Sequence, residues 1–265
     1  MKIAIIGAGN LGISIAKGIL KNSIASSLYL TKRHVDSLEA FNVEEFVVIT
    51  KDNKLAIENS DVVIFAVQPN HLEAIFIENK PFFKDKHILI STVTGFSIQN
   101  ITEILGSSNG VVRAMPNTAI AVGKSMTCIS TMDGEHTKLK SAVKIFSVLG
   151  QVLVIPEHLM QAATVVCASG IAFWMRMIRA STQAAIQLGF DAKEAQQLAM
   201  YTAEGAAHLL IATGNHPEEE IDKVTTPKGC TIEGLNEMEH QGLSSSVIKG
   251  MMASYHKIDG IKDMP

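Results

Sequence analysis

The sequence predicts an α/β fold class, in which an N-terminal doubly wound sheet is followed by an all-helical C-terminal domain. Short apolar runs of strand length alternate with helical patterns as far as Pro156, and only helical patterns follow it. A glycine-rich turn joins the first apolar run to the first helical pattern. The chain of 265 residues is long enough for two domains, which we place at residues 1–156 and 157–265.

The glycine-rich turn is the strongest local signal. The apolar run 3–6 is typical of a buried parallel strand, and Gly7, Gly9 and Gly12 follow it as G-x-G-x-x-G. Gly7 permits a tight turn, Gly9 leaves room for a pyrophosphate, and Gly12 lets the next helix pack closely. An ordinary strand–helix turn is the alternative, but the order of elements favours a Rossmann-type dinucleotide site, because the helix start offers free N–H groups to phosphates. The cofactor-binding residues expected here are Gly7, Gly9, Asn10, Leu11 and Gly12.

The residues that end the second strand distinguish the two nicotinamide cofactors. A domain that selects NADH places Asp or Glu about 20 residues beyond the glycines, to hold the ribose 2′-OH. This chain has Thr31, Lys32 and Arg33 after the short strand 28–30. A carboxylate would repel a 2′-phosphate, whereas a hydroxyl and two cations attract it. We therefore expect NADPH, with NADH possible but weaker; a solvated basic turn is the alternative.

The rest of the first domain completes the sheet. Further strands are expected at residues 46–50, 61–67, 87–93, 111–115, 125–130 and 151–155, with a helix from about 135 to 149. In a doubly wound sheet the cofactor lies along the carboxyl edge of the strands. Turns after two strands at that edge add the cofactor candidates Ala66, Val67, Gln68, Pro69, Met115, Pro116 and Asn117. A simple turn cap is the alternative for Asn117.

The second domain is predicted to consist of apolar helices. The segment 158–188 is helical in pattern, is interrupted at Ser169-Gly170 and is closed by Gly189. Asp191 caps a second helix to about residue 212, and Pro217 opens a third. Apolar residues occur on more than one face, which indicates burial against a second subunit. Packing on the first domain alone is the alternative.

A polar loop between helices is the candidate substrate site. Residues 224–235 concentrate hydroxyls, a glycine and a helix start, which together make a cradle for a carboxylate. A capped helix start without a ligand is the alternative. The expected substrate-binding residues are Thr226, Gly229, Cys230 and Thr231.

The bulk composition excludes several classes of function. A net charge of -3 gives no indication of nucleic acid or of an anionic membrane surface. The three cysteines have no metal-ligand spacing, so we expect free thiols in a reducing compartment and no metal. The apolar N-terminal run is too short for a signal peptide or a membrane span, which predicts a cytoplasmic protein.

Taken together, these segments resemble the pyrroline-5-carboxylate reductase family over essentially the whole chain. The resemblance rests on the glycine turn, the segments 66–69, 113–118 and 168–173, Asn53, and the loop 225–235. It implies NAD(P)H-dependent reduction of 1-pyrroline-5-carboxylate, a cyclic imine, to L-proline, the last step of proline biosynthesis. It also implies an interlocked homodimer, often assembled into a larger ring of dimers. In the family the last motif binds the substrate carboxylate and ring nitrogen, which implies a catalytic role for Thr231 and adds Asn53 to the cofactor-binding residues.

The chain departs from the family pattern at three positions. The family usually has Lys where Gln68 stands, Pro where Ile171 stands, and Gly where Lys228 stands. These changes remove a cation beside the cofactor, remove a rigid turn, and put a flexible side chain in the substrate loop. Gly229 and Thr231 are retained.

The chemistry of an imine fits the residues present. A protonated cyclic imine accepts a hydride without a strong side-chain acid, whereas a carbonyl reductase needs a donor for the developing alkoxide. The segment 158–188 contains no lysine, which favours the imine. Two alternatives remain: an NADP-dependent hydroxyacid dehydrogenase of related architecture, and a non-catalytic protein that senses the dinucleotide.

Overall fold

The computed structural model describes residues 1–41, 45–106, 110–132 and 136–259. They form two compact units, Met1–Ser169 with Ser254–Pro265, and Gly170–Ala253. The predicted domain boundary after residue 156 lies just after the last strand. The compact units divide later in the chain, because the segment from residue 157 to Ser169 belongs to the first unit.

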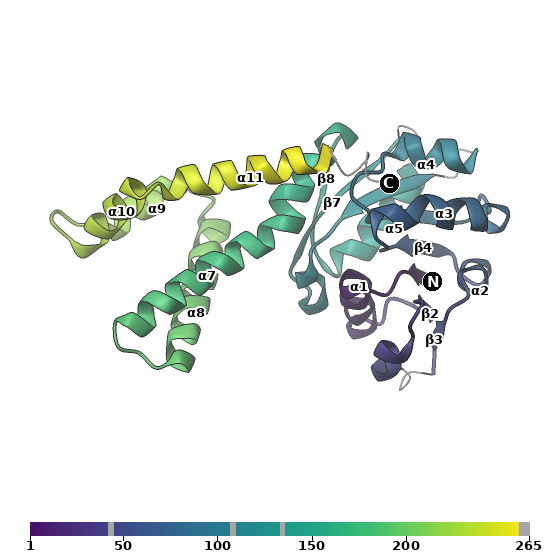
Figure 1. Cartoon of the computed structure of the whole chain (residues 1–265), viewed down its shortest axis with the longest axis horizontal. Coiled ribbons are helices and arrows are strands. Elements are labelled where there is room, and N and C mark those ends of the chain that lie inside the picture. Colours follow the sequence, from purple (N-terminus) through teal and green to yellow (C-terminus); the bar gives the residue numbers. More distant parts are fainter. Residues whose placement is uncertain (42–44, 107–109, 133–135, 260–265) are drawn as a thin grey trace. The chain divides into compact units, whose positions relative to one another are not determined.

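The first unit is built on a sheet of eight strands in the order β3-β2-β1-β4-β5-β6-β7-β8 (Figure 1). The strands are β1 Lys2–Ile6, β2 Ser27–Thr31, β3 Val47–Thr50, β4 Val62–Phe65, β5 Ile88–Ser91, β6 Val111–Met115, β7 Ser125–Thr131 and β8 Gly150–Val154. The first six run parallel, β7 is antiparallel to β6, and β8 is parallel to β7. In this register Ile6 is paired with Thr31 and Phe65, so the carboxyl ends of β1, β2 and β4 meet at one edge. The doubly wound sheet predicted from the sequence is confirmed.

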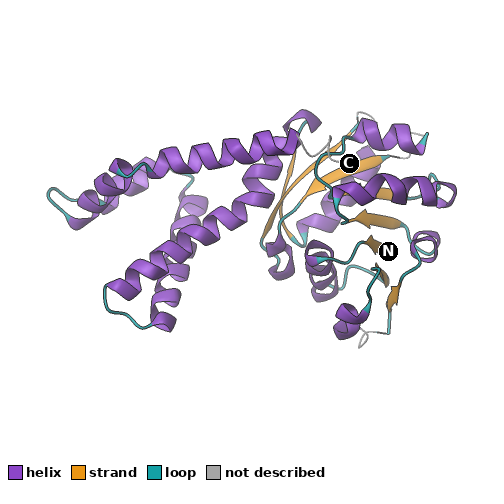
Figure 2. Ribbon diagram, in the orientation of Figure 1, coloured by secondary structure: helices purple, strands orange, loops and turns teal. Residues whose placement is uncertain are grey.

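Helices cover both faces of this sheet and create two apolar cores (Figure 2). The helices are α1 Asn10–Lys21, α2 Asn53–Glu58, α3 Pro69–Asn79, α4 Ile98–Leu105 and α5 His136–Ser147, with short 3₁₀ turns at Asp36–Phe41, Lys80–Phe82, Thr118–Val122 and Glu157–Leu159. α1 and α5 pack on one face and α2, α3 and α4 on the other, because alternate strand residues such as Ile5 and Ile6 point to opposite faces. The predicted start of α5 at residue 135 lies outside the described residues.

The helical segment after the sheet contains a π-helix. The chain passes from α6 (Met160–Ala163) through π-helical turns at Thr164–Ser169 into α7 (Gly170–Gln187). The sequence predicted an interruption at Ser169-Gly170, and the structure places there the change from π-helix to α-helix. A π-helix carries an extra residue per turn and is frequent at functional sites.

One stretch within the described residues, Glu157–Gln187, is long and apolar enough by length and composition to cross a membrane. The most apolar window of 18 residues within it has a mean hydropathy of 1.3. The same properties suit a helix that is covered by protein, so this is weak evidence for a membrane.

The second unit consists of helices with hardly any core of their own. They are α7, α8 (Ala192–Thr213), α9 (Pro217–Val224), α10 (Cys230–His240) and α11 (Leu243–Asp259), whose last residues belong to the first unit. α7 and α8 form a hairpin, and Asp191 caps α8 by accepting the N–H groups of Lys193 and Glu194 at 2.8 and 2.9 Å (Figure 1). Large apolar side chains remain exposed on both helices, including Trp174, Ile186 and Ile211.

Candidate functional site

The three glycines of the turn after β1 each occupy a position that a side chain would disturb or block. Gly7 has φ +92°, and a Cβ atom there would lie 2.4 Å from Val67 Cγ1. A Cβ atom on Gly12 would lie 2.5 Å from the carbonyl oxygen of Gly7, so this glycine lets α1 approach the turn. A Cβ atom on Gly9 would meet nothing within 4 Å, which leaves open space where the helix begins. This geometry fits a pyrophosphate against the turn.

The start of α1 offers its N–H groups to a ligand. Gly9 is the N-cap residue and supplies no side-chain cap, and Asn10, Leu11 and Gly12 form the first turn. An uncapped helix start with its positive dipole end attracts phosphate. Asn10, Leu11 and Gly12 do not line the neighbouring cavity. Their expected contact with a phosphate is through the N–H groups of the first helical turn.

A cavity of about 540 Å³ lies beside this turn at the carboxyl edge of the sheet. It brings together nine of the predicted cofactor residues, which are Gly7, Gly9, Thr31, Lys32, Arg33, Asn53, Ala66, Val67 and Gln68. Pro69, at the first position of α3, does not line it, and neither do Met115, Pro116 or Asn117. The site residues at the ends of β1, β2 and β4 therefore converge, as the parallel register requires.

Basic groups surround the end of the cavity at β2. Lys32 Nζ donates to Ser37 Oγ at 2.7 Å, and Arg33 Nη2 lies 3.3 Å from His71 Nε2. His34 and Lys51 also line the cavity, and Glu78 is its acidic member. Cations therefore outnumber carboxylates in this lining, and a 2′-phosphate would be attracted to this end.

Thr31 has a structural role that differs from that of the neighbouring Lys32 and Arg33. The residue is 2% exposed, and its hydroxyl lies 3.4 Å from the N–H of Gly7 in a hydrogen bond that the hydroxyl accepts. Its carbonyl oxygen also accepts the N–H of Ala8 at 2.8 Å. Thr31 thus supports the glycine turn, and contact with a 2′-phosphate falls to Lys32 and Arg33.

The sequence reasoning missed His34, Lys51 and His71, which line the same cavity. Lys51 directly follows β3 and His34 lies three positions after the end of β2, so the position of those strand ends was a usable signal. His71 lies in the first turn of α3 and reaches Arg33 across 38 positions of sequence, which no local pattern indicates.

The end of β6 is tied to the π-helical segment. Met115 and Pro116 are buried, and Asn117 lies at the end of the strand. Asn117 Nδ2 donates to the carbonyl oxygen of Cys167 at 3.1 Å, and its Oδ1 accepts the N–H of Ala119 at 3.0 Å. The turn cap that was the alternative reading of Asn117 is therefore present, together with a long-range contact.

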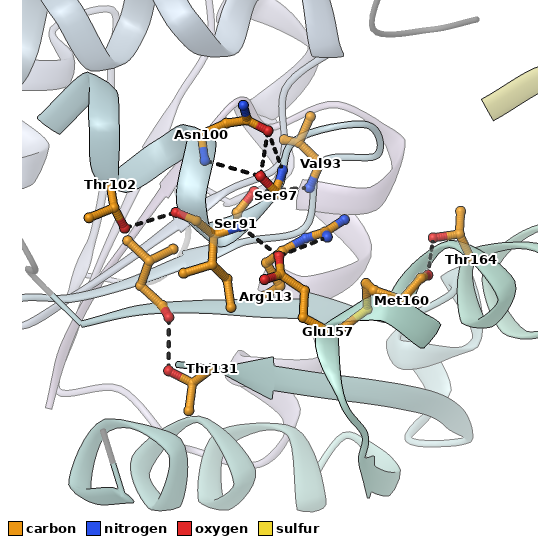
Figure 3. Close-up of polar contacts among 12 residues, drawn as sticks. Ser91, Val93, Ser97, Asn100, Thr102, Arg113, Thr131, Glu157, Met160 and Thr164 are labelled. Carbon is orange, nitrogen blue, oxygen red and sulfur yellow. Dashed lines mark hydrogen bonds and ion pairs between the residues drawn. The ribbon is translucent and has the colours of Figure 1, made fainter. Parts of the chain in front are cut away.

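A partly buried ion pair supports the same edge of the sheet (Figure 3). Glu157 Oε1 accepts from Arg113 Nη1 at 3.2 Å and from the N–H of Ile98, at the start of α4, at 2.6 Å. Burial lowers the pKa of Arg113, and the carboxylate of Glu157 opposes that shift. Both residues line a second cavity of about 340 Å³ with Thr94, Ser97 and Thr164. The pair joins β6, α4 and the entry to α6, and sequence patterns gave no sign of Glu157 because the partners are 44 positions apart.

The candidate substrate loop forms a tight turn before α10. The N–H of Gly229 donates to the carbonyl oxygen of Thr226 at 2.9 Å, and a Cβ atom on Gly229 would lie 2.4 Å from Thr226 Oγ1. Gly229 is the N-cap residue of α10 and supplies no side-chain cap, and Cys230 and Thr231 form the first turn. The N-cap position thus belongs to Gly229 and not to Thr231, so the hydroxyl of Thr231 is not needed to cap the helix.

Lys228 adopts a backbone conformation that favours glycine. Its φ is +58°, one of two positive values among the described non-glycine residues. An L-residue pays roughly 1–2 kcal/mol for this left-handed region, and glycine adopts it without steric cost. The position is the one at which the resembled family has glycine.

We expect Lys228→Gly to stabilise the protein by about 0.5–1 kcal/mol, because the relief of strain exceeds the extra entropy that glycine has in the unfolded chain. Urea unfolding measures the change. Lys228→Ala is the matched control, since alanine also loses the long side chain but keeps the Cβ atom. Equal unfolding midpoints for the two variants would show that the backbone at this position is unstrained.

The sheet order, the glycine turn and the basic cavity define a Rossmann-type dinucleotide-binding protein that continues into a helical unit. Residues 2–95 match the family model described as NADP oxidoreductase, coenzyme F420-dependent, and residues 157–261 match that described as pyrroline-5-carboxylate reductase dimerisation. The chain is 40% identical to pyrroline-5-carboxylate reductase 2 of Dictyostelium discoideum, over 96% of this chain and 91% of that one. The chain belongs to the pyrroline-5-carboxylate reductase family.

Other relatives and solved structures agree with this membership. Pyrroline-5-carboxylate reductase 1 of D. discoideum is 42% identical over 96% of this chain, which spans 49%, about half, of that relative's length. The reductase of Methanosarcina acetivorans is 31% identical, with 95% of this chain and 94% of the relative covered. Among solved structures, a pyrroline-5-carboxylate reductase from Coxiella burnetii has a TM-score of 0.85 at 27% identity, with 98% of both chains covered. The NADP-bound pyrroline carboxylate reductase of Plasmodium falciparum shares the fold, with a TM-score of 0.90 at 23% identity over 99% of this chain and 98% of that one.

Proposed function

We propose that this protein reduces 1-pyrroline-5-carboxylate to L-proline with NADPH, the last step of proline biosynthesis. The observation that carries the proposal is the match to reductases of this name from the glycine turn to the substrate loop. The cavity at the carboxyl edge of the sheet supports the cofactor, and the uncapped start of α10 supports the substrate.

NADPH supplies the hydride when it is bound. The turn at Gly7 and Gly9 and the N–H groups of Asn10, Leu11 and Gly12 hold its pyrophosphate, and Lys32 and Arg33 hold its 2′-phosphate. Asn53, Ala66, Val67 and Gln68 form the remaining wall. We assign Pro69, Met115, Pro116 and Asn117 to supporting positions at the strand ends, where their backbone shapes the site.

The substrate loop positions the imine. The free N–H groups at the start of α10, at Cys230 and Thr231, donate to the substrate carboxylate, and Gly229 and Thr226 shape the turn in front of them. The hydroxyl of Thr231 lies against the ring nitrogen and orients it. Solvent supplies the proton of the imine, so the protein contributes position and electrostatics and needs no strong acid.

The function is tested by following NADPH oxidation with 1-pyrroline-5-carboxylate, beside NADP reduction with 3-hydroxy acids. We expect turnover only with the imine. Turnover of hydroxy acids would favour the dehydrogenase alternative, in line with a cation of the helical unit acting at the nicotinamide. NADPH binding without turnover of either substrate would favour the dinucleotide sensor.

We further propose that the protein is a soluble cytoplasmic homodimer joined through its helical unit, with a ring of dimers as a larger assembly. Trp174 is 68% exposed and Ile211 79% exposed in the single chain, and Phe173 and Met177 are half-buried. Each such side chain contributes roughly 1.5–3 kcal/mol when a partner covers it. Exposure on this scale across one helical hairpin is typical of an interface.

We expect a dimer by size-exclusion chromatography with light scattering, and we expect Trp174→Glu to raise the dimer dissociation constant at least about tenfold. Ile77→Glu is the matched control, because Ile77 is also a strongly exposed apolar residue, 58%, on α3 of the first unit. A monomeric wild-type chain would contradict the dimer. Equal effects of the two substitutions would place the interface elsewhere.

A further inference from the structure

Two cysteines from different elements of the first unit lie in contact. Cys128 is on β7 and is 3% exposed, and Cys167 is in the π-helical segment Thr164–Ser169 and is half-buried. Their Sγ atoms are 3.8 Å apart, although the residues are 39 positions apart in the sequence. Both thiols are free in the structure. A disulfide has an Sγ–Sγ distance of about 2.05 Å, so the two sulfur atoms must approach each other further for a bond to form.

The environment gives the two thiols different roles. The hydrogen bond between them lowers the pKa of Cys167 to about 7. The same hydrogen bond, together with burial, raises the pKa of Cys128. Only a thiolate attacks an oxidant, and the more exposed sulfur is the one that an oxidant reaches. Cys167 therefore has the properties of the attacking sulfur, and Cys128 those of the sulfur that resolves it.

We propose that Cys128 and Cys167 are a redox modification site, at which hydrogen peroxide or a small disulfide forms a reversible disulfide between β7 and the π-helical segment. With peroxide, the thiolate of Cys167 forms an S–O bond as the O–O bond breaks, and the departing hydroxide takes up a proton as water. The sulfur of Cys128 then forms the S–S bond as the S–O bond breaks, and a second water leaves. Two thiols lose two electrons in total, and one peroxide becomes two waters. With a small disulfide, the thiolate of Cys167 forms a mixed disulfide as one small thiolate leaves, and Cys128 then displaces the second, so that the small disulfide is reduced to two thiols.

The disulfide would fix the π-helical segment, which contacts the carboxyl edge of the sheet near the end of β6. The carbonyl oxygen of Cys167 accepts the side-chain amide of Asn117 at the end of β6, and β7 pairs with β6 at Met115 and Cys128. A covalent link from β7 to the π-helix would hold this acceptor beside Asn117. The redox state of the pair therefore sets how firmly the π-helical segment is attached to the sheet.

The test uses the full-length chain carrying Cys230→Ser, so that the exposed third thiol does not react. The chain is treated with glutathione disulfide or hydrogen peroxide, digested without reduction and examined by mass spectrometry. We expect a cross-linked pair of peptides containing Cys128 and Cys167, which dithiothreitol separates. We also expect the melting temperature to rise by about 5 °C or more on oxidation and to return on reduction, because the link closes a long loop.

The control variants carry Cys128→Ser or Cys167→Ser in the same background, with circular dichroism to verify folding. Neither should gain stability on oxidation, and Cys128→Ser should instead accumulate a glutathione adduct at Cys167. The proposal is overturned if the parent chain, treated in the same way, accumulates the adduct at Cys167 without the cross-linked peptides. It is equally overturned if both thiols remain free. Neither readout depends on the proposed reductase activity.

Discussion

Replacing Thr231 by alanine should lower kcat/KM for 1-pyrroline-5-carboxylate by about ten- to a hundredfold and leave the affinity for NADPH unchanged. The hydroxyl lies in the uncapped first turn of α10, and a lost hydrogen bond to a charged group is worth roughly 1.5–3 kcal/mol. The measurement pairs steady-state kinetics with a melting curve on the same preparation. Because Gly229 holds the N-cap position, the substitution should hardly change the melting temperature.

Two variants separate a contact with substrate from a general loss of structure. Thr231→Ser keeps the hydroxyl and should retain most of the activity. Thr213→Ala removes a hydroxyl at the end of α8 that donates to the carbonyl oxygen of Leu209, so it should affect stability and not kcat/KM. Unchanged kcat/KM in a folded Thr231→Ala protein would show that this loop is not the substrate cradle.

The double substitution Lys32→Ala/Arg33→Ala should lower kcat/KM with NADPH on the order of ten- to a hundredfold and change that with NADH much less. Only NADPH carries the 2′-phosphate, and a charge-assisted contact to it contributes roughly 1.5–3 kcal/mol. Both side chains line the cavity beside the glycine turn. Raising the salt concentration should reduce the preference of the wild type for NADPH over NADH. The side chains of Lys32 and Arg33 are partly in solvent, where salt screens their charges.

A charge-matched control is available on α1. Lys17→Ala/Lys21→Ala removes two exposed positive charges that do not line the cavity. It should preserve the ratio of the two cofactor efficiencies. Equal losses of kcat/KM with NADPH and with NADH in the Lys32/Arg33 variant would mean that these two side chains do not bind the 2′-phosphate.

Much of the first unit was predictable because its strands are buried on both faces. β4 is a continuous apolar run and β1 is one after Lys2, both are bounded by turn residues, and the predicted ends agree with the structure to within two residues. The glycine turn was predictable for a related reason: Gly7 has a φ of +92°, which favours glycine, and Gly12 lies against the carbonyl oxygen of Gly7 only five positions earlier. A constraint between residues that are close in sequence restricts the residue type there, so a sequence pattern can reveal it.

The features that were not predictable depend on distance in sequence or on a small change of helical period. A π-helix and an α-helix differ too little in period for the apolar pattern of residues 164–169 to separate them. The antiparallel direction of β7 leaves no mark on its own residues. Glu157 and His71 contact residues that are distant in sequence and that only the tertiary fold brings close. Lys228 has a φ of +58°, which its residue type does not indicate.

The scarcity of buried side chains in the second unit also affects how this protein tolerates mutation. In a symmetric dimer every amino-acid change occurs twice, and a residue near the two-fold axis meets its own copy. A single substitution at Trp174 or Ile211 would then alter the dimer interface at two places, once in each chain. Mutational drift on the faces of α7 and α8 that a partner covers would thus be restricted, because each change alters the shared interface at two places.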